Sequence, residues 1–144
     1  MPTEYSEDIV LTHPSVPPSA LFDDLRSDFY QTSSITVVRS DPVPSDKFWW
    51  VQACSGWHNT AMAQNMRISV SAIHGNSVAN REVVLASEGN VVSSGGGQVQ
   101  FQVPRRFIVP PGGMINCHIT TAVGGTGPIV QFQYLELDVG QEIW

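Results

Sequence analysis

Hydrophobic and polar residues alternate with a period of two along much of the chain after residue 35. The clearest case is the segment 98–103, where Val99, Phe101 and Val103 are separated by glutamines, the last of them Gln102. Side chains two residues apart share one face of a strand, so this pattern predicts a half-buried antiparallel strand whose outer face carries amides. An uncharged amide face costs less to bury against a partner than a charged one. The segment therefore indicates a contact surface.

Eight segments rich in β-branched and aromatic residues each predict a strand. They are 35–39, 48–53, 66–73, 82–86, 98–103, 107–109, 114–121 and 129–139. The segments between them, rich in glycine, proline and asparagine, are predicted turns or loops, among them 88–90, and 55–57 is also a predicted turn. The number and spacing of the strands predict an all-β fold, a single β-sandwich or jelly roll of about eight antiparallel strands.

The first 20 residues differ from the rest of the chain. They contain four prolines and one short apolar patch, Ile9-Val10-Leu11, so residues 1–20 are predicted to form an extended arm. Leu21, Phe22, Leu25 and Phe29 then follow at spacings of three and four, which predicts one short helix near 20–29. The predicted organisation is an arm over 1–20 and a sandwich domain over 21–144.

The last strand combines two apolar patterns. Val130, Phe132 and Tyr134 share one parity, whereas the apolar residues from Leu135 to Val139 share the other. A regular strand cannot turn both sets inward, so either a bulge lies near Tyr134-Leu135 or the strand is covered on both faces. The second alternative would indicate a subunit interface.

Tryptophans supply the candidate contact residues. Trp49 and Trp50 are adjacent, so on a strand they point to opposite faces, and one of them needs cover from outside the main core. That cover can be a sugar, a loop, the helix or another subunit. Trp49, Trp50 and Trp57 are therefore candidates for contact with a glycan or a partner.

The chain ends in Ile143-Trp144, and an apolar end is unfavourable in water. We expect it to dock on a neighbouring subunit. Together with Tyr134, these two residues are the candidates for a subunit interface.

Charge is sparse and unevenly placed. Charged residues make up 14% of the chain and the net charge is −6. Residues 1–46 hold eight acidic and two basic residues, whereas 47–144 hold five of each. This distribution argues against nucleic-acid binding, which needs a basic footprint. No stretch has the length of a membrane span and no signal peptide is evident, so no membrane role is expected.

Candidate chemistry is weak. Cys54 and His58 are four residues apart, but the strand and turn predicted there would not bring them together as metal ligands. Cys117 and His118 are adjacent and so point to opposite faces of a strand. Both cysteines fit small buried apolar residues better than a disulfide, although their state is left open. We expect no catalytic residues, no metal and no cofactor, and the chain is not predicted to be an enzyme.

The segment 107–119, read FIVPPGGMINCHI, and the later segment 129–137, read IVQFQYLEL, resemble small jelly-roll virion proteins of tailed bacteriophages. The resemblance covers about residues 98–139 and rests on a strand that enters a Pro-Gly corner and on a long final hairpin. It implies a capsid decoration, or cement, protein that stabilises the phage head as an oligomer, with a homotrimer favoured.

On this interpretation the partner is the major capsid protein or another virion protein, and the protein is located in the virion after assembly in the host cytoplasm. Ile9, Val10 and Leu11 would anchor the arm on that partner. Linked weak contacts of this kind gain strength through multivalency. The alternative is a glycan-binding or receptor-binding module of a phage tail tip or fibre, for which the tryptophans would supply the contacts.

Overall fold

A computed structural model describes residues 25–33, 35–73, 80–93, 101–122 and 126–140. Regular structure in these ranges is entirely β. The strands are β1 (Arg26–Gln31), β2 (Val37–Arg39), β3 (Lys47–His58), β4 (Gln64–Ile73), β5 (Asn80–Val91), β6 (Phe101–Gln102), β7 (Phe107–Val109), β8 (Met114–His118) and β9 (Pro128–Asp138). Each of the eight predicted segments overlaps one of these strands, and β1 is additional.

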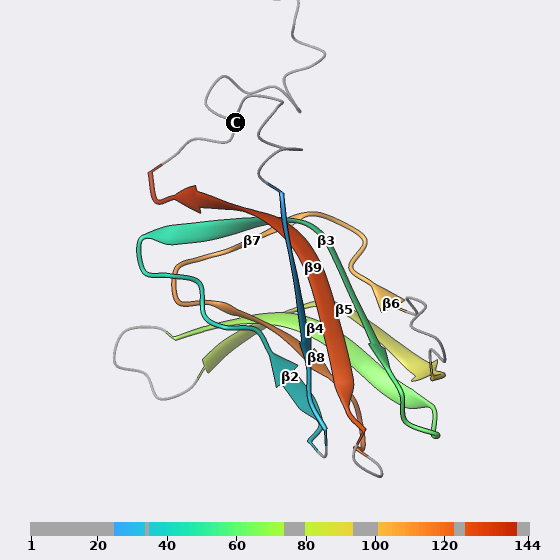
Figure 1. Ribbon diagram of the computed structural model, residues 1–144. Coiled ribbons are helices and arrows are strands. Elements are labelled where there is room, and N and C mark those ends of the chain that lie inside the picture. The colour runs from blue at the N-terminus through green and yellow to red at the C-terminus, as the bar shows by residue number, and fades with distance from the viewer. Residues whose placement is uncertain (1–24, 34, 74–79, 94–100, 123–125, 141–144) are drawn as a thin grey trace, which may run out of the picture.

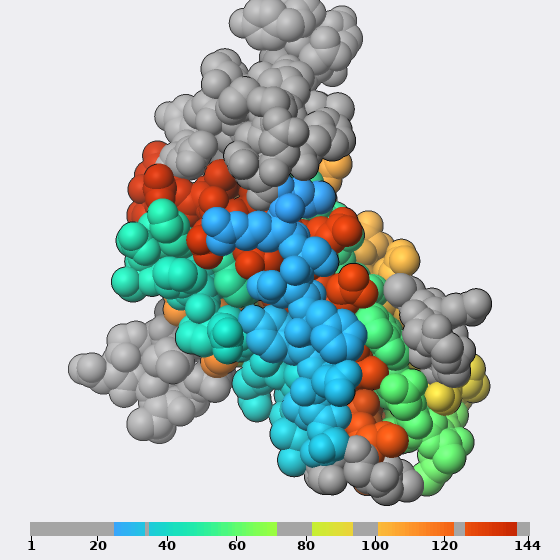
Figure 2. Space-filling view, viewed as in Figure 1, coloured from blue at the N-terminus to red at the C-terminus, as the bar shows by residue number. Residues whose placement is uncertain are grey.

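The strands form two antiparallel sheets that pack face to face (Figure 1). The first sheet has the order β1-β9-β3, and both β6 and β7 pair with the far edge of β3. The second sheet has the order β2-β8-β4-β5. In the space-filling view, β1 crosses the centre of the visible face beside side chains of β9 (Figure 2). The all-β sandwich predicted from the sequence is confirmed.

The core between the sheets is built around an aromatic cluster. The Phe132 ring lies 6.0 Å from the ring of Tyr30, 5.6 Å from that of Trp49 and 5.4 Å from that of Tyr134. Aliphatic side chains of the second sheet, among them Ile68, close the layer from the other side. Large buried rings remove much apolar surface from water, so this cluster contributes strongly to holding the sheets together.

The predicted helix near 20–29 is wrong where it can be compared. Residues 26–29 lie in β1, because the edge of β9 offers a full ladder to them, from Arg26 opposite Tyr134 to Gln31 opposite Ile129. Residues 20–24 and the predicted arm over 1–20 lie outside the described residues.

Two predicted turns are also strands. β3 continues through 55–57, since all three residues pair with β9 and the first two also pair with β6. β5 continues through 88–90. There Asn90 adopts a positive φ of 57°, and its N–H donates to Oδ1 of Asn65 at 3.2 Å. A single asparagine that tolerates this conformation keeps the strand continuous, so no chain reversal is required.

The two parities of the last strand have a clear structural origin. β9 is itself continuous, and the irregularity lies in β3, where Gln52 is the extra residue between Val51 opposite Tyr134 and Ala53 opposite Gln133. Beyond this point Leu135 is buried on the outer face of the first sheet, against residues of the same chain. Of the two predicted alternatives, cover on both faces is therefore observed, and a bulge occurs in the neighbouring strand.

The sheets approach closely at Gly56. A Cβ at this position would lie 2.8 Å from Sγ of Cys117 and 3.4 Å from Cδ1 of Ile68, both on the second sheet. We expect Gly56→Ala to lower the free energy of unfolding by about 1–3 kcal/mol through overpacking, measured by chemical denaturation. In a Cys117→Ala background the same change should cost less, because the clashing sulfur is gone. An equal cost in both backgrounds would contradict this account of the packing.

Candidate functional site

The outer face of the first sheet carries a row of polar and aromatic side chains. In register across four strands lie Phe29 of β1, Gln131 of β9, Ser55 of β3 and Gln102 of β6. Cross-strand neighbours in an antiparallel sheet share a face. The row therefore places two amides and a hydroxyl side by side, with an aromatic ring at one end.

A second row follows one step along the strands. Ser27 lies opposite Gln133, and Gln133 lies opposite Ala53 of β3, next to the extra residue Gln52. The Gln52 side-chain amide donates to the carbonyl oxygen of Trp50 at 3.3 Å, which turns this residue back along its own strand. The bulge therefore adds a fourth strand-borne amide to the three supplied by the two rows.

The pairing at the far edge of β3 is split beside this bulge. β6 pairs with Ser55 and Gly56, and β7 pairs with Trp49–Val51, so the link between β6 and β7 leaves the edge in between. Within this link, the N–H of Val103 donates a hydrogen bond to the carbonyl oxygen of Cys54 on β3 at 2.9 Å. The split opens the sheet edge without breaking the sheet.

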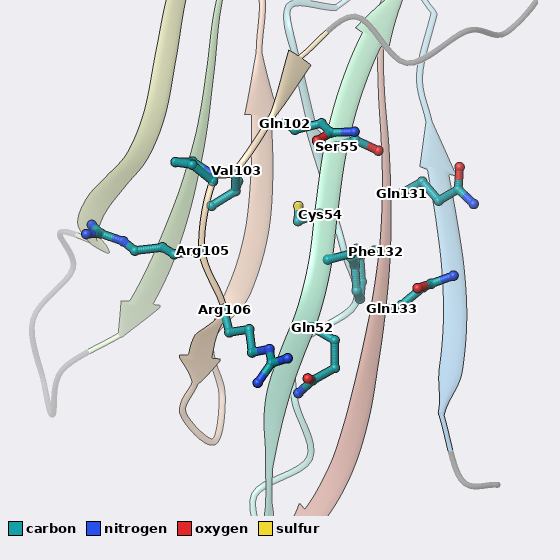
Figure 3. A pocket seen from close by; sticks show the side chains of 12 residues that line it. Gln52, Cys54, Ser55, Gln102, Val103, Arg105, Arg106, Gln131, Phe132 and Gln133 are labelled. Carbon is teal, nitrogen blue, oxygen red and sulfur yellow. The ribbon is translucent and has the colours of Figure 1, made fainter. Parts of the chain in front are cut away.

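The result is a groove of about 620 Å³ over β3 and β9, bordered by the link between β6 and β7 (Figure 3). Its border is formed by Gln52, Ala53, Cys54, Ser55, Gln102, Val103, Pro104, Arg105, Arg106, Gln131, Phe132 and Gln133. Four of these are glutamines and none carries a carboxylate. An uncharged amide can both donate and accept hydrogen bonds, so the groove suits a ligand covered with hydroxyl groups.

The two arginines of the link point in different directions. In Figure 3 the Arg106 side chain extends toward Gln52, whereas Arg105 extends away from β3 and β9. Both residues are exposed. None of the ion pairs among the described side chains involves either of them. One uncompensated positive charge therefore faces the amide surface.

An aromatic pair stands at the β1 end of the first row. The Phe29 ring is 51% exposed and lies 5.8 Å from the Trp57 ring, which is 7% exposed. Phe29 thus covers Trp57 and itself presents a ring to solvent. Trp57, a candidate contact residue from the sequence, supports the exposed ring from beneath.

An apolar patch lies next to the groove, on the same face of the first sheet. Trp50 lies opposite Leu135 of β9 and Ile108 of β7, and Phe48 lies opposite Leu137. The two leucines are buried, while Trp50 and Phe48 are partly buried against them. The cover that Trp50 needs outside the main core is therefore provided by side chains of the same chain.

The other predicted contact residues lie elsewhere. Trp49 is 3% exposed in the core, and its Nε1–H donates to Oε2 of Glu136 at 3.0 Å. Tyr134, predicted at a subunit interface, is also a core residue, and its hydroxyl donates to Asp28 at 2.7 Å. Burial raises the pKa of the Tyr134 phenol, with Asp28 adding to the effect. The remaining candidates, Ile9, Val10, Leu11, Ile143 and Trp144, lie outside the described residues.

Sequence reasoning missed most of the groove, because Gln52, Arg106 and the β9 glutamines carried no motif. One signal was available in Gln131-Phe132-Gln133, which repeats the alternation of amide and apolar residues seen before Val103. The two alternating segments meet on the sheet, because Gln102 and Gln131 lie on either side of Ser55.

The cysteines and His58 are structural. Burial raises the pKa of the Cys117 thiol to about 12 and raises that of Cys54 as well, so neither is a ready nucleophile. His58 is fully buried, with Nε2 2.7 Å from the Val91 carbonyl oxygen and Nδ1 accepting from the Thr60 N–H. Within the described ranges no three His, Cys, Asp or Glu side chains are grouped as metal ligands, and no helix there could cross a membrane.

A second polar cluster lies on the outer face of the second sheet. Glu82 accepts from Ser69 at 2.6 Å and from Nε2 of His118 at 2.9 Å, and it pairs with Arg67 at 3.3 Å. These groups satisfy one another. The serine bonds to the carboxylate and not to the histidine, so this is not the arrangement of an activated nucleophile.

No protein-family model matches the chain, and no curated protein matches it. Among solved structures, the chain is similar to the CBM22-1 and GH10 modules of endo-1,4-β-D-xylanase 10B from Clostridium thermocellum, complexed with xylohexaose. The identity is 13% and the TM-score 0.41, over 85% of this chain and 27% of that one. The chain therefore spans about a quarter of the length of that protein.

A second similar structure is the C-terminal family 22 carbohydrate-binding module of the same enzyme, at 11% identity and a TM-score of 0.36, over 78% of this chain and 71% of that one. At these scores neither likeness bears on function.

The second polar cluster predicts a pH dependence. Burial, helped by Arg67 and Arg39, holds the pKa of His118 below its usual value, against the opposing effect of Glu82. The unfolded chain then binds the proton more readily, so this part of the stability is present above about pH 6.5 and lost as the pH falls below it. We expect His118→Gln to flatten the stability profile between pH 7 and pH 5, measured by urea denaturation. A profile as steep as that of the wild type would contradict this.

Proposed function

We propose that the chain is a carbohydrate-binding module and that the groove of the first sheet holds the saccharide. One observation carries this proposal. Gln52, Gln102, Gln131, Gln133 and Ser55 converge on one groove, and no carboxylate is found among the described residues that border it. A sugar presents many hydroxyl groups, each both donor and acceptor, and amides match them without the desolvation that a carboxylate would require.

The sheet makes the groove rigid. Gln131, Gln133 and Ser55 stand on the two central strands of the first sheet, which pair over nearly their whole length. Side chains on a paired strand lose less freedom on binding than those on a loop, so more of the interaction energy becomes affinity. The exposed Phe29 ring, in register with Gln131, supports the same function, because the apolar face of a sugar ring packs on an aromatic ring.

This proposal is the alternative function from the sequence, a glycan-binding module, and it involves binding without catalysis. The capsid decoration function stays a prediction. The same holds for the resemblance to phage virion proteins, the homotrimer, the major capsid protein as partner and the location in the virion.

The binding proposal predicts the effect of removing the central amides. Native affinity gels containing xylan, mannan, galactan, polygalacturonate or alginate should retard the wild-type protein on at least one of these polymers. Replacing both Gln131 and Gln133 by Ala should weaken retardation by about tenfold or more, since two hydrogen-bonding groups at roughly 1 kcal/mol each are lost.

Gln31→Ala is the matched control for this experiment. Gln31 is exposed on β1 of the same sheet but does not border the groove. The control should bind as the wild type does. No retardation on any polymer, or an equal loss in the control and the double variant, would refute the proposed function.

A further inference from the structure

The groove differs from the whole chain in the sign of its charge. The net charge of the chain is −6, yet among the described residues that border the groove only Arg105 and Arg106 are charged. The groove is therefore a local positive site on an acidic protein. Such a site favours an anionic group over a neutral one wherever the charge is not already neutralised.

Nearby carboxylates are engaged elsewhere. On β9, Glu136 accepts from Nη1 of Arg26 at 2.8 Å and from the Trp49 indole, and Asp138 pairs with Lys47. On β1, Asp28 accepts from the Tyr134 hydroxyl. These acidic groups on β9 and β1 bond to other side chains, and none of them pairs with Arg106, so its guanidinium has no carboxylate partner among the described residues.

The position of Arg106 is set by the fold. Val103 is tied to β3 through the Cys54 carbonyl, and Phe107 pairs with Val51, so the link between them is held at both ends. Pro104 within the link has a fixed φ, which limits its freedom further. The Arg106 side chain extends toward Gln52 at the bulge, whereas the neighbouring Arg105 points away (Figure 3).

We infer that the groove selects saccharides that carry a carboxylate, that is, uronic-acid residues, and that Arg106 is the residue that selects them. The guanidinium fork matches a carboxylate with two parallel hydrogen bonds. The Gln52 amide beside it and the amides of β9 would hold the hydroxyl groups of the same sugar. This inference rests on the proposed function, and it narrows the ligand from saccharides in general to acidic ones.

The test compares polygalacturonate with the same polymer after reduction of its carboxyl groups, which leaves the chain and its hydroxyls but removes the charge. Binding is measured by isothermal titration calorimetry at 50 mM and 500 mM salt. We expect the acidic polymer to bind at least tenfold more tightly at low salt. The difference should shrink at high salt, because an exposed charge pair is screened.

Two variants with the same net charge locate the effect. Arg106→Gln should reduce affinity for the acidic polymer about tenfold and leave binding of the reduced polymer within twofold. Arg105→Gln removes the same charge one residue away and should keep the preference. Arg106→Lys retains the charge but not the fork, and should fall between the wild type and Arg106→Gln. Circular dichroism spectra and melting temperatures confirm that each variant folds.

Several outcomes would overturn the inference. Equal affinity for the acidic and the reduced polymer would refute the selection for a carboxylate but not the proposed function. Binding to neutral polysaccharides alone would have the same consequence. Equal losses in the two glutamine variants would assign the effect to overall charge and not to Arg106. Binding of poly-glutamate as tight as that of polygalacturonate would indicate an acidic peptide as the ligand. Absence of binding to every polysaccharide would refute both the inference and the proposed function.

Discussion

The pairing of β3 with its neighbours determines the shape of the first sheet and of its groove. On one side β3 forms an almost unbroken ladder with β9, and on the other it pairs first with β7 and then with β6. The extra residue, Gln52, lies where the second edge is divided. Because β3 pairs with β9 directly before and after this residue, the sheet stays intact while the opposite edge opens and leaves a groove. The groove is therefore a consequence of strand pairing, formed without a long loop.

The same register sets what lies on either side of the sheet. Toward the core it directs Trp49 and Phe132 into the aromatic cluster, and Gly56 permits the second sheet to approach. Toward solvent it sorts residues into rows that change from aromatic and amide at Phe29 to apolar at Trp50. A polar surface proposed to bind a ligand and an apolar surface that stabilises the sheet can thus share one face, because each row meets only its own cross-strand neighbours.

Period-two alternation predicted much of the fold, and its failures have physical causes. The strand at 107–109 has the same bounds in the structure because proline and glycine follow it directly. β1 was missed because Leu25 and Phe29 are four residues apart, a spacing that puts side chains on one face of a helix and also of a strand. The groove could not be predicted, since the proximity of Gln52, Gln133 and Arg106 depends on a bulge and on strand pairing that no local pattern encodes.

The proposed function requires that the ligand binds in the amide groove. Its most direct test is a nuclear magnetic resonance titration with polygalacturonate oligosaccharides that follows the side-chain amide signals of glutamine and asparagine. Binding in the groove should shift the signals of Gln52, Gln102, Gln131 and Gln133 together, while those of Gln64 and Asn65 on β4 of the second sheet stay in place. Shifts confined to residues of the second sheet, or to the apolar patch around Trp50, would contradict it.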